Sequence, residues 1–155
     1  MQIKSLFIKN FKSIRELWIK DIENALILVG KNNTGKTVVL DAIRAVTGDL
    51  EIKESYFNEK KQNIEIGMSL ELSEEDLMQF HTLGVVSSYK RFETWKRDFC
   101  GKLPSWENGI LEFTCIIHQS GKKRYDDGFS KNNRYIPAFH NIWNFCPKEK
   151  DKNQI

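Results

Sequence analysis

The sequence contains no apolar run that approaches the roughly 20 residues a membrane-spanning helix needs. Residues 1–11 hold no uninterrupted apolar h-region and no small-residue cleavage site, so we expect no signal peptide. The chain has only 3 cysteines, Cys100, Cys115 and Cys146, and this odd, scattered set argues against a disulfide framework. These absences predict a cytoplasmic protein with reduced thiols and no membrane partner.

Proline and glycine are also scarce, at 3 and 9 of 155 residues, whereas 40% of the residues are hydrophobic and 29% are charged. Such a composition supports a buried core rather than a disordered chain, and the length is typical of one domain. The net charge is only +3, and the positive excess lies in the last third of the chain. A solvated surface explains this excess more simply than a polyanion site, although DNA stays a candidate partner.

Residues 29–37 read VGKNNTGKT and contain a complete G-x-x-x-x-G-K-[ST] pattern. The apolar run 24–30 ends in glycine and is typical of a short strand buried on both faces. Residues 36–48 place apolar side chains at helical spacing and end at Gly48, a natural stop. The members of the pattern are Gly30, Lys31, Asn32, Asn33, Thr34, Gly35, Lys36 and Thr37. Strand, glycine loop and helix in this order predict a phosphate-binding loop.

Each fixed position of the loop has a physical task. Gly30 and Gly35 allow the tight turn that brings backbone N–H groups onto phosphate oxygens. The helix that begins near Lys36 directs free N–H groups and its positive dipole end at the same anion. Lys36 can reach the β- and γ-phosphates, and Thr37 offers its hydroxyl to a bridging Mg²⁺. The loop therefore predicts binding of a nucleoside triphosphate with Mg²⁺.

Apolar patterning predicts a strand-rich remainder. Residues 3–11 and 17–22 indicate a hairpin. Residues 64–72 alternate apolar and polar side chains, as in an antiparallel strand with one buried face, and 110–118 indicate another strand. Cys115 and His118 are three residues apart on the latter strand and so face opposite sides, which argues against a zinc site.

Two helices are expected after the first half of the chain. Ser73 is placed to cap a helix over 73–81, whose first turn is acidic. Aromatic residues recur every three or four positions over 85–99 beside lysines and arginines. Such a stripe can stack on nucleic-acid bases, but it is more often the core face of an amphipathic helix.

The segments IKSLFIKNFKSI, LILVGKNNTGKTVVLDAI and RYIPAF resemble the N-terminal lobe of the RecF/SMC/OLD group of ABC-type ATPases. The resemblance is specific over residues 1–48, and Asn32–Asn33 looks closest to the overcoming-lysogenization-defect (OLD) endonucleases and similar AAA-type ATPases of phage defence. It implies an α/β P-loop NTPase lobe of ABC type, with a mixed sheet around the P-loop helix and an antiparallel β layer. It also implies bound ATP and Mg²⁺, with Thr37 on the metal.

The resemblance assigns further residues to the nucleotide. Asn32 corresponds to a position that contacts the γ-phosphate or the attacking water, and Val38 follows the loop directly. Lys12 and Ser13, in the NFKS turn, correspond to residues near the nucleotide. For Lys12 an exposed hairpin lysine is the competing interpretation.

The sequence departs from the family where hydrolysis is concerned. It has no hhhhDE strand, no LSGG-like signature segment and no recognisable switch histidine. MSLELSEED comes nearest to hhhhDE, but its acidic run fits a helix start better. We therefore expect one partial ATPase head over residues 1–147, a charged flexible end over 148–155, and no catalytic residue in this chain.

The expected partners follow from this departure. They are the missing C-terminal half of the head or a second ATPase head, with a homo-oligomer in the parent protein, which would act on DNA in repair or phage defence. ATP affinity without efficient turnover is expected, because the loop mainly supplies ground-state binding. A small P-loop kinase is one alternative. A degenerate head that binds a protein or DNA through helix 85–99 or the basic turn Lys122–Arg124 is another.

Overall fold

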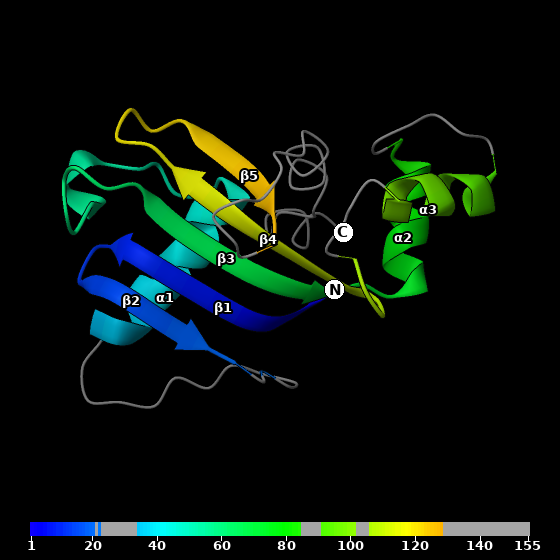
Figure 1. Cartoon of the computed structure of the whole chain (residues 1–155), viewed down its shortest axis with the longest axis horizontal. Coiled ribbons are helices and arrows are strands. Elements are labelled where there is room, and N and C mark those ends of the chain that lie inside the picture. The colour runs from blue at the N-terminus through cyan, green and yellow to red at the C-terminus, as the bar shows by residue number, and fades with distance from the viewer. Residues whose placement is uncertain (21, 23–33, 85–90, 102–105, 129–155) are drawn as a thin grey trace, which may run out of the picture.

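The computed structural model describes residues 1–20, 22, 34–84, 91–101 and 106–128. Within these residues five strands form one sheet in the order β2-β1-β3-β4-β5, and every neighbouring pair is antiparallel (Figure 1). The strands are β1 (Gln2–Phe11), β2 (Ile14–Ile19), β3 (Ile64–Glu71), β4 (Ile110–Ile117) and β5 (Lys123–Asp127). The helices are α1 (Thr34–Thr47), the 3₁₀ turn η1 (Glu54–Tyr56), α2 (Glu74–Thr82) and α3 (Phe92–Gly101).

One face of the sheet forms the hydrophobic core. The register aligns Ile8, Ile66, Cys115 and Tyr125 in a row across four strands, and all four side chains are buried. Helix α1 crosses this region on one side of the sheet (Figure 1). The side chains that α1 buries in the core are Val38, Val39, Ala42, Ala45 and Val46. Burial of an aliphatic side chain stabilises the fold by about 1.5–3 kcal/mol, so this stripe fixes the helix on the sheet.

The end of α1 is held by side chains from β5. Gly48 follows the helix with φ of 82°, the left-handed conformation that glycine adopts without strain. Tyr125 donates its hydroxyl to the Val46 carbonyl at 2.6 Å, and Lys123 donates its ammonium to the Ala45 carbonyl at 2.7 Å. The last carbonyls of the helix therefore have partners from a strand almost 80 residues later in the chain.

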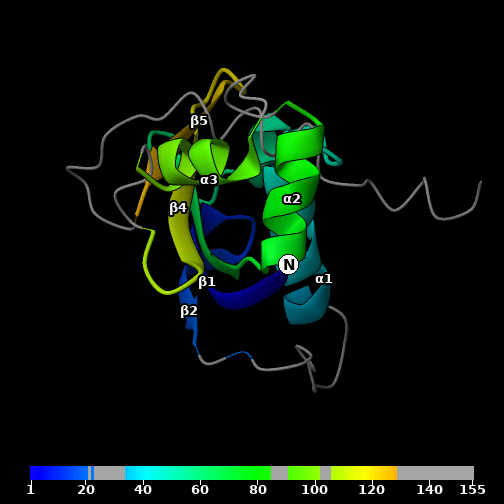
Figure 2. The same cartoon turned by 90° about the vertical axis from the view of Figure 1, so that its right-hand side faces the viewer.

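Helices α2 and α3 lie together beyond one end of the sheet (Figures 1 and 2). Ser73 caps α2, as the sequence predicts, and Asp76 completes a reciprocal capping box with it. In α3, Trp95 and Phe99 are fully buried and stacked with ring centroids 4.9 Å apart. These two rings therefore belong to the core and are closed to nucleic-acid bases.

The hairpin and the antiparallel strands expected over 64–72 and 110–118 are confirmed. Several sequence predictions lie outside the described residues. They are the buried strand over 24–30, the start of the helix over 85–90, the apolar segment over 134–145 that contains RYIPAF, and the flexible end over 148–155. Among the described residues, no helix is both long enough and apolar enough to span a bilayer.

Candidate nucleotide-binding site

Helix α1 begins inside the phosphate-loop pattern. Its first residue is Thr34, so Gly35, Lys36 and Thr37 form its first turn. The first N–H groups of a helix have no partner within the helix and carry its positive dipole end, so this turn is suited to bind an anion. Gly30, Lys31, Asn32 and Asn33 lie outside the described residues, as do the side chains of Thr34 and Lys36.

The two loop residues that follow differ in burial. Thr37 is exposed, which leaves its hydroxyl accessible to a ligand. Val38 packs in the core under α1. A nucleotide contact at Val38 would therefore come from its backbone rather than from its side chain.

The β1–β2 turn carries Lys12 and Ser13 to the same helix. The Lys12 ammonium lies 2.6 Å from Asp41 Oδ2 on α1, and 4.4 Å from the centre of the Tyr56 ring. The Asp41 carboxylate also lies 3.3 Å from an Arg44 nitrogen. Lys12 is thus a partly buried ion-pair partner of the P-loop helix, whereas Ser13 beside it is exposed.

The backbone of this turn is fixed by residues that follow α1. Lys12 has a φ of 53°, which is uncommon outside glycine. Its N–H donates to the Tyr56 carbonyl at 2.6 Å, and Asn58 donates its side-chain amide to the Lys12 carbonyl at 2.8 Å. These two bonds hold the unusual backbone conformation that directs the Lys12 side chain toward α1.

Asn10 is a structural residue of the turn that sequence reasoning missed. It is buried with a φ of 60°, and its amide nitrogen donates to the carbonyls of Glu59, Gln62 and Asn63. Its side-chain oxygen accepts the N–H of Glu59. The available signal was an asparagine directly before the last residue of a strand, since asparagine tolerates left-handed backbone better than most residues.

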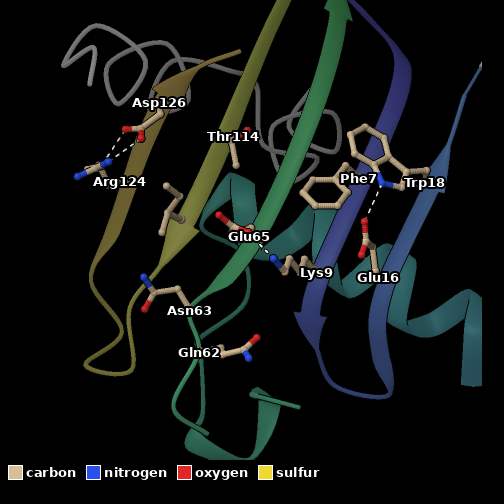
Figure 3. A pocket seen from close by; sticks show the side chains of 11 residues that line it. Phe7, Lys9, Glu16, Trp18, Gln62, Asn63, Glu65, Thr114, Arg124 and Asp126 are labelled. Carbon is tan, nitrogen blue, oxygen red and sulfur yellow. Dashed lines mark hydrogen bonds and ion pairs between the residues drawn. The ribbon is translucent and has the colours of Figure 1, made fainter. Parts of the chain in front are cut away.

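The opposite face of the sheet holds a hollow of about 600 Å³ (Figure 3). Phe7 and Trp18 stack there with ring centroids 4.3 Å apart. Around them, Lys9 pairs with Glu65 at 3.7 Å, and Figure 3 shows Arg124 beside Asp126 on β5. Four of the charges that line the hollow, those of Lys9, Glu65, Arg124 and Asp126, are thus paired with opposite charges.

The basic turn Lys122–Arg124 is largely used within the fold. Lys123 bonds to the end of α1, and Arg124 makes two hydrogen bonds to Asp126, at 2.6 and 2.8 Å. Lys122 is exposed. This geometry weakens the interpretation of the turn as a nucleic-acid patch, because two of its three cations already bind protein oxygens.

The buried thiol of β4 is unsuited to bind a metal. Burial raises the pKa of Cys115 to about 12, so the thiol stays protonated. Burial, followed by the neighbouring Cys115, also raises the pKa of Tyr125. His118 is exposed. Among the described residues, no three histidine, cysteine, aspartate or glutamate side chains are grouped so that they could hold a metal ion.

Two kinds of comparison relate the chain to known proteins. The family model described as AAA ATPase domain matches residues 1–154. An SMC ATPase structure, from work on ATP-driven dimerization and DNA-stimulated activation, aligns with a TM-score of 0.56 and 18% identity, over 94% of this chain and 77% of its own. The Smc head domain of Pyrococcus yayanosii, with its coiled coil and joint, aligns with a TM-score of 0.54 and 18% identity. This alignment covers 92% of this chain and 24% of the Smc chain.

No curated protein sequence matches the chain significantly. The structural likeness shows the fold, and the family match covers almost every residue. The antiparallel sheet with the P-loop helix on one face thus has the P-loop NTPase-like fold of the N-terminal lobe of an SMC head. The chain belongs to the AAA ATPase domain family.

Proposed function

We propose that this chain is the ATP-binding lobe of an SMC-like ATPase head. The observation that carries the proposal is the start of α1 at Thr34, inside GKNNTGKT, so that the first helical turn is Gly35-Lys36-Thr37. The family match supports ATP as the nucleotide. The antiparallel sheet favours this lobe over a small P-loop kinase, because such kinases are built on parallel strands that alternate with helices.

The residues of the loop divide the work of holding ATP. The backbone N–H groups from Gly30 to Thr37 would bind the phosphates, and Lys36 would neutralise the β- and γ-phosphates. The exposed Thr37 hydroxyl would hold Mg²⁺, which supplies charge neutralisation between the same phosphates. We place Asn32 near the γ-phosphate, with Lys12 and Ser13 beside the nucleotide, as the family resemblance implies.

We propose that efficient hydrolysis needs a second protein surface. The acidic residues nearest to an hhhhDE pattern form the first turn of α2, where Asp76 binds Ser73 and the N-terminal ammonium of Met1. Asp76 is therefore occupied in structure. The SMC ATPase neighbour dimerizes in response to ATP. We therefore propose that the partner is the remaining half of the head or a second head in a homo-oligomer.

We further propose that the parent protein acts on DNA, in repair or in phage defence, as an OLD-like ATPase. The support is the Asn32–Asn33 pair in the loop and the DNA-stimulated activation of the SMC neighbour. Retention of the chain on DNA should weaken steeply with salt if phosphate contacts carry the binding. Binding to DNA that ignores both salt and ATP would contradict this part of the proposal.

ATP titration with Mg²⁺, followed by calorimetry, tests the proposed function. The parent chain and Lys60→Ala, which removes an exposed lysine far from the loop in sequence, should bind ATP with equal affinity. Lys36→Ala should lose most of that affinity. Equal binding by Lys36→Ala and the parent would overturn the assignment, and phosphoryl transfer to a nucleoside would favour the kinase instead.

A further inference from the structure

The position of Asp41 relative to the loop suggests a role beyond packing. Asp41 lies four residues after Thr37, so both side chains project from the same side of α1, one turn apart. A separation of four residues corresponds to roughly 6 Å along the helix axis. The Lys12 ammonium, held at 2.6 Å by Asp41, thus lies about one helical turn from the residue expected to hold the Mg²⁺ of ATP.

The side chain of Lys12 is the movable part of this arrangement. Its backbone is bound on both sides, through its N–H to Tyr56 and through its carbonyl to Asn58. Its ammonium lies against Asp41 and the face of the Tyr56 ring, and the side chain is 24% exposed. A lysine side chain has four rotatable bonds, so a change of rotamer can carry the charge toward the helix start while the turn stays fixed.

The charges on this side of α1 also favour exchange of partners. Asp41 is shared by two cations, Lys12 at 2.6 Å and Arg44 at 3.3 Å. If Lys12 leaves, Arg44 still compensates the carboxylate, which is only 10% exposed. The triphosphate of ATP would bring several negative charges to the start of the helix and compete for the ammonium.

We propose that Asp41 is a positioning residue that holds the Lys12 ammonium on α1 until the phosphates of a bound nucleotide compete for it. The inference rests on the proposed ATP site, and it makes the ion pair a latch that nucleotide binding opens. The ion pair lowers the affinity for ATP, because the phosphates must compete with Asp41 for the ammonium. It also keeps Lys12 ordered beside the loop. The latch links occupation of the loop to the contact between the Lys12 ammonium and the Tyr56 ring.

A double-mutant cycle tests the latch. Asp41→Asn should bind ATP about twofold to fivefold more tightly than the parent, the scale on which a partly exposed ion pair competes. Lys12→Ala should bind ATP more weakly, and Asp41→Asn should bring no gain in the Lys12→Ala background. Asp49→Asn is the matched control, since it removes the same charge just beyond the other end of α1. Adenosine, which lacks phosphates, should bind all variants alike.

The outcomes separate this inference from the proposed function. If the parent binds ATP and Lys36→Ala does not, the ATP site stands. The latch is then overturned by an Asp41→Asn affinity equal to or weaker than that of Asp49→Asn, or by a gain that persists without Lys12. If Lys36→Ala binds ATP like the parent, or the parent does not bind ATP, both proposals fail.

A measurement on the parent chain keeps the inference testable if Asp41→Asn does not fold. The Lys12 side-chain ammonium is observed by NMR of ¹⁵N-labelled lysine and identified by its loss in Lys12→Arg. Its signal should move on addition of ATP with Mg²⁺ and stay in place with adenosine. A signal that ATP leaves unmoved, in a chain shown to bind ATP, would overturn the latch.

Discussion

Replacing Asn10 by alanine should destabilise the chain more than almost any other single change at a polar residue. The Asn10 amide donates at 2.8 Å to Gln62 and at 3.0 Å to Glu59, and its oxygen accepts one N–H. Three well-formed hydrogen bonds at about 1 kcal/mol each give a loss of about 3 kcal/mol. Alanine at a φ of 60° adds about 1 kcal/mol of backbone strain, so we expect a total of about 4 kcal/mol.

Glycine at the same position separates the two contributions. Asn10→Gly loses the hydrogen bonds but tolerates the left-handed backbone, so it should cost about 3 kcal/mol, roughly 1 kcal/mol less than Asn10→Ala. Asn58→Ala is the matched control in the same segment, because it is exposed and loses one hydrogen bond to Lys12. It should cost about 0.5–1 kcal/mol.

Urea unfolding followed by tryptophan fluorescence measures these differences, provided that each variant unfolds in one cooperative transition. The expected order of stability is parent, Asn58→Ala, Asn10→Gly and Asn10→Ala. If Asn10→Ala and Asn58→Ala agree within about 0.5 kcal/mol, the hydrogen bonds around Asn10 do not hold the turn, and the reasoning is refuted.

Three further predictions concern other parts of the fold. Burial raises the pKa of Asp76, but hydrogen bonds from the Met1 ammonium and Ser73 outweigh this effect and hold the pKa below its usual range. The ionised Asp76 therefore stabilises the folded chain above about pH 4, and this stabilisation is lost as the pH falls through the folded pKa. In Asp76→Asn the free energy of unfolding should therefore fall less steeply at acidic pH than in the parent. An equally steep fall in both proteins would refute this. Tyr125→Phe should cost about 1 kcal/mol through the lost bond to Val46, and an unchanged unfolding midpoint would contradict that value. Cys115, whose pKa is raised to about 12, should react with iodoacetamide only when the chain unfolds. Mass spectrometry of the labelled peptides measures this reaction, and rapid labelling of Cys115 in the folded chain would count against its burial.

Local patterns of the sequence predicted much of the sheet and the start of the site. The alternation over 64–72 identified β3, because side chains of a strand point to opposite faces in turn. The glycine-rich loop before an apolar helix identified the start of α1, since the required residues are adjacent in the chain. Ser73 and the acidic residues that follow it identified the start of α2 for the same reason.

The contacts that complete the site join residues far apart in the chain. Lys12 and Asp41 are 29 residues apart, and Asn10 bonds to carbonyls about 50 residues later. Lys123 reaches the end of α1 only because β5 is the outermost strand next to β4. These contacts depend on the order and register of the strands, which local spacing leaves open.

Backbone NMR of the ¹⁵N-labelled chain during ATP titration tests the central claim most directly. With Mg²⁺ present, we predict that the largest amide shifts occur at Gly35, Lys36, Thr37 and Val38, at the start of α1. Smaller shifts should follow at Lys12. Shifts that instead gather around Trp18 and Phe7, in the hollow on the opposite face of the sheet, would contradict an ATP site at the start of this helix.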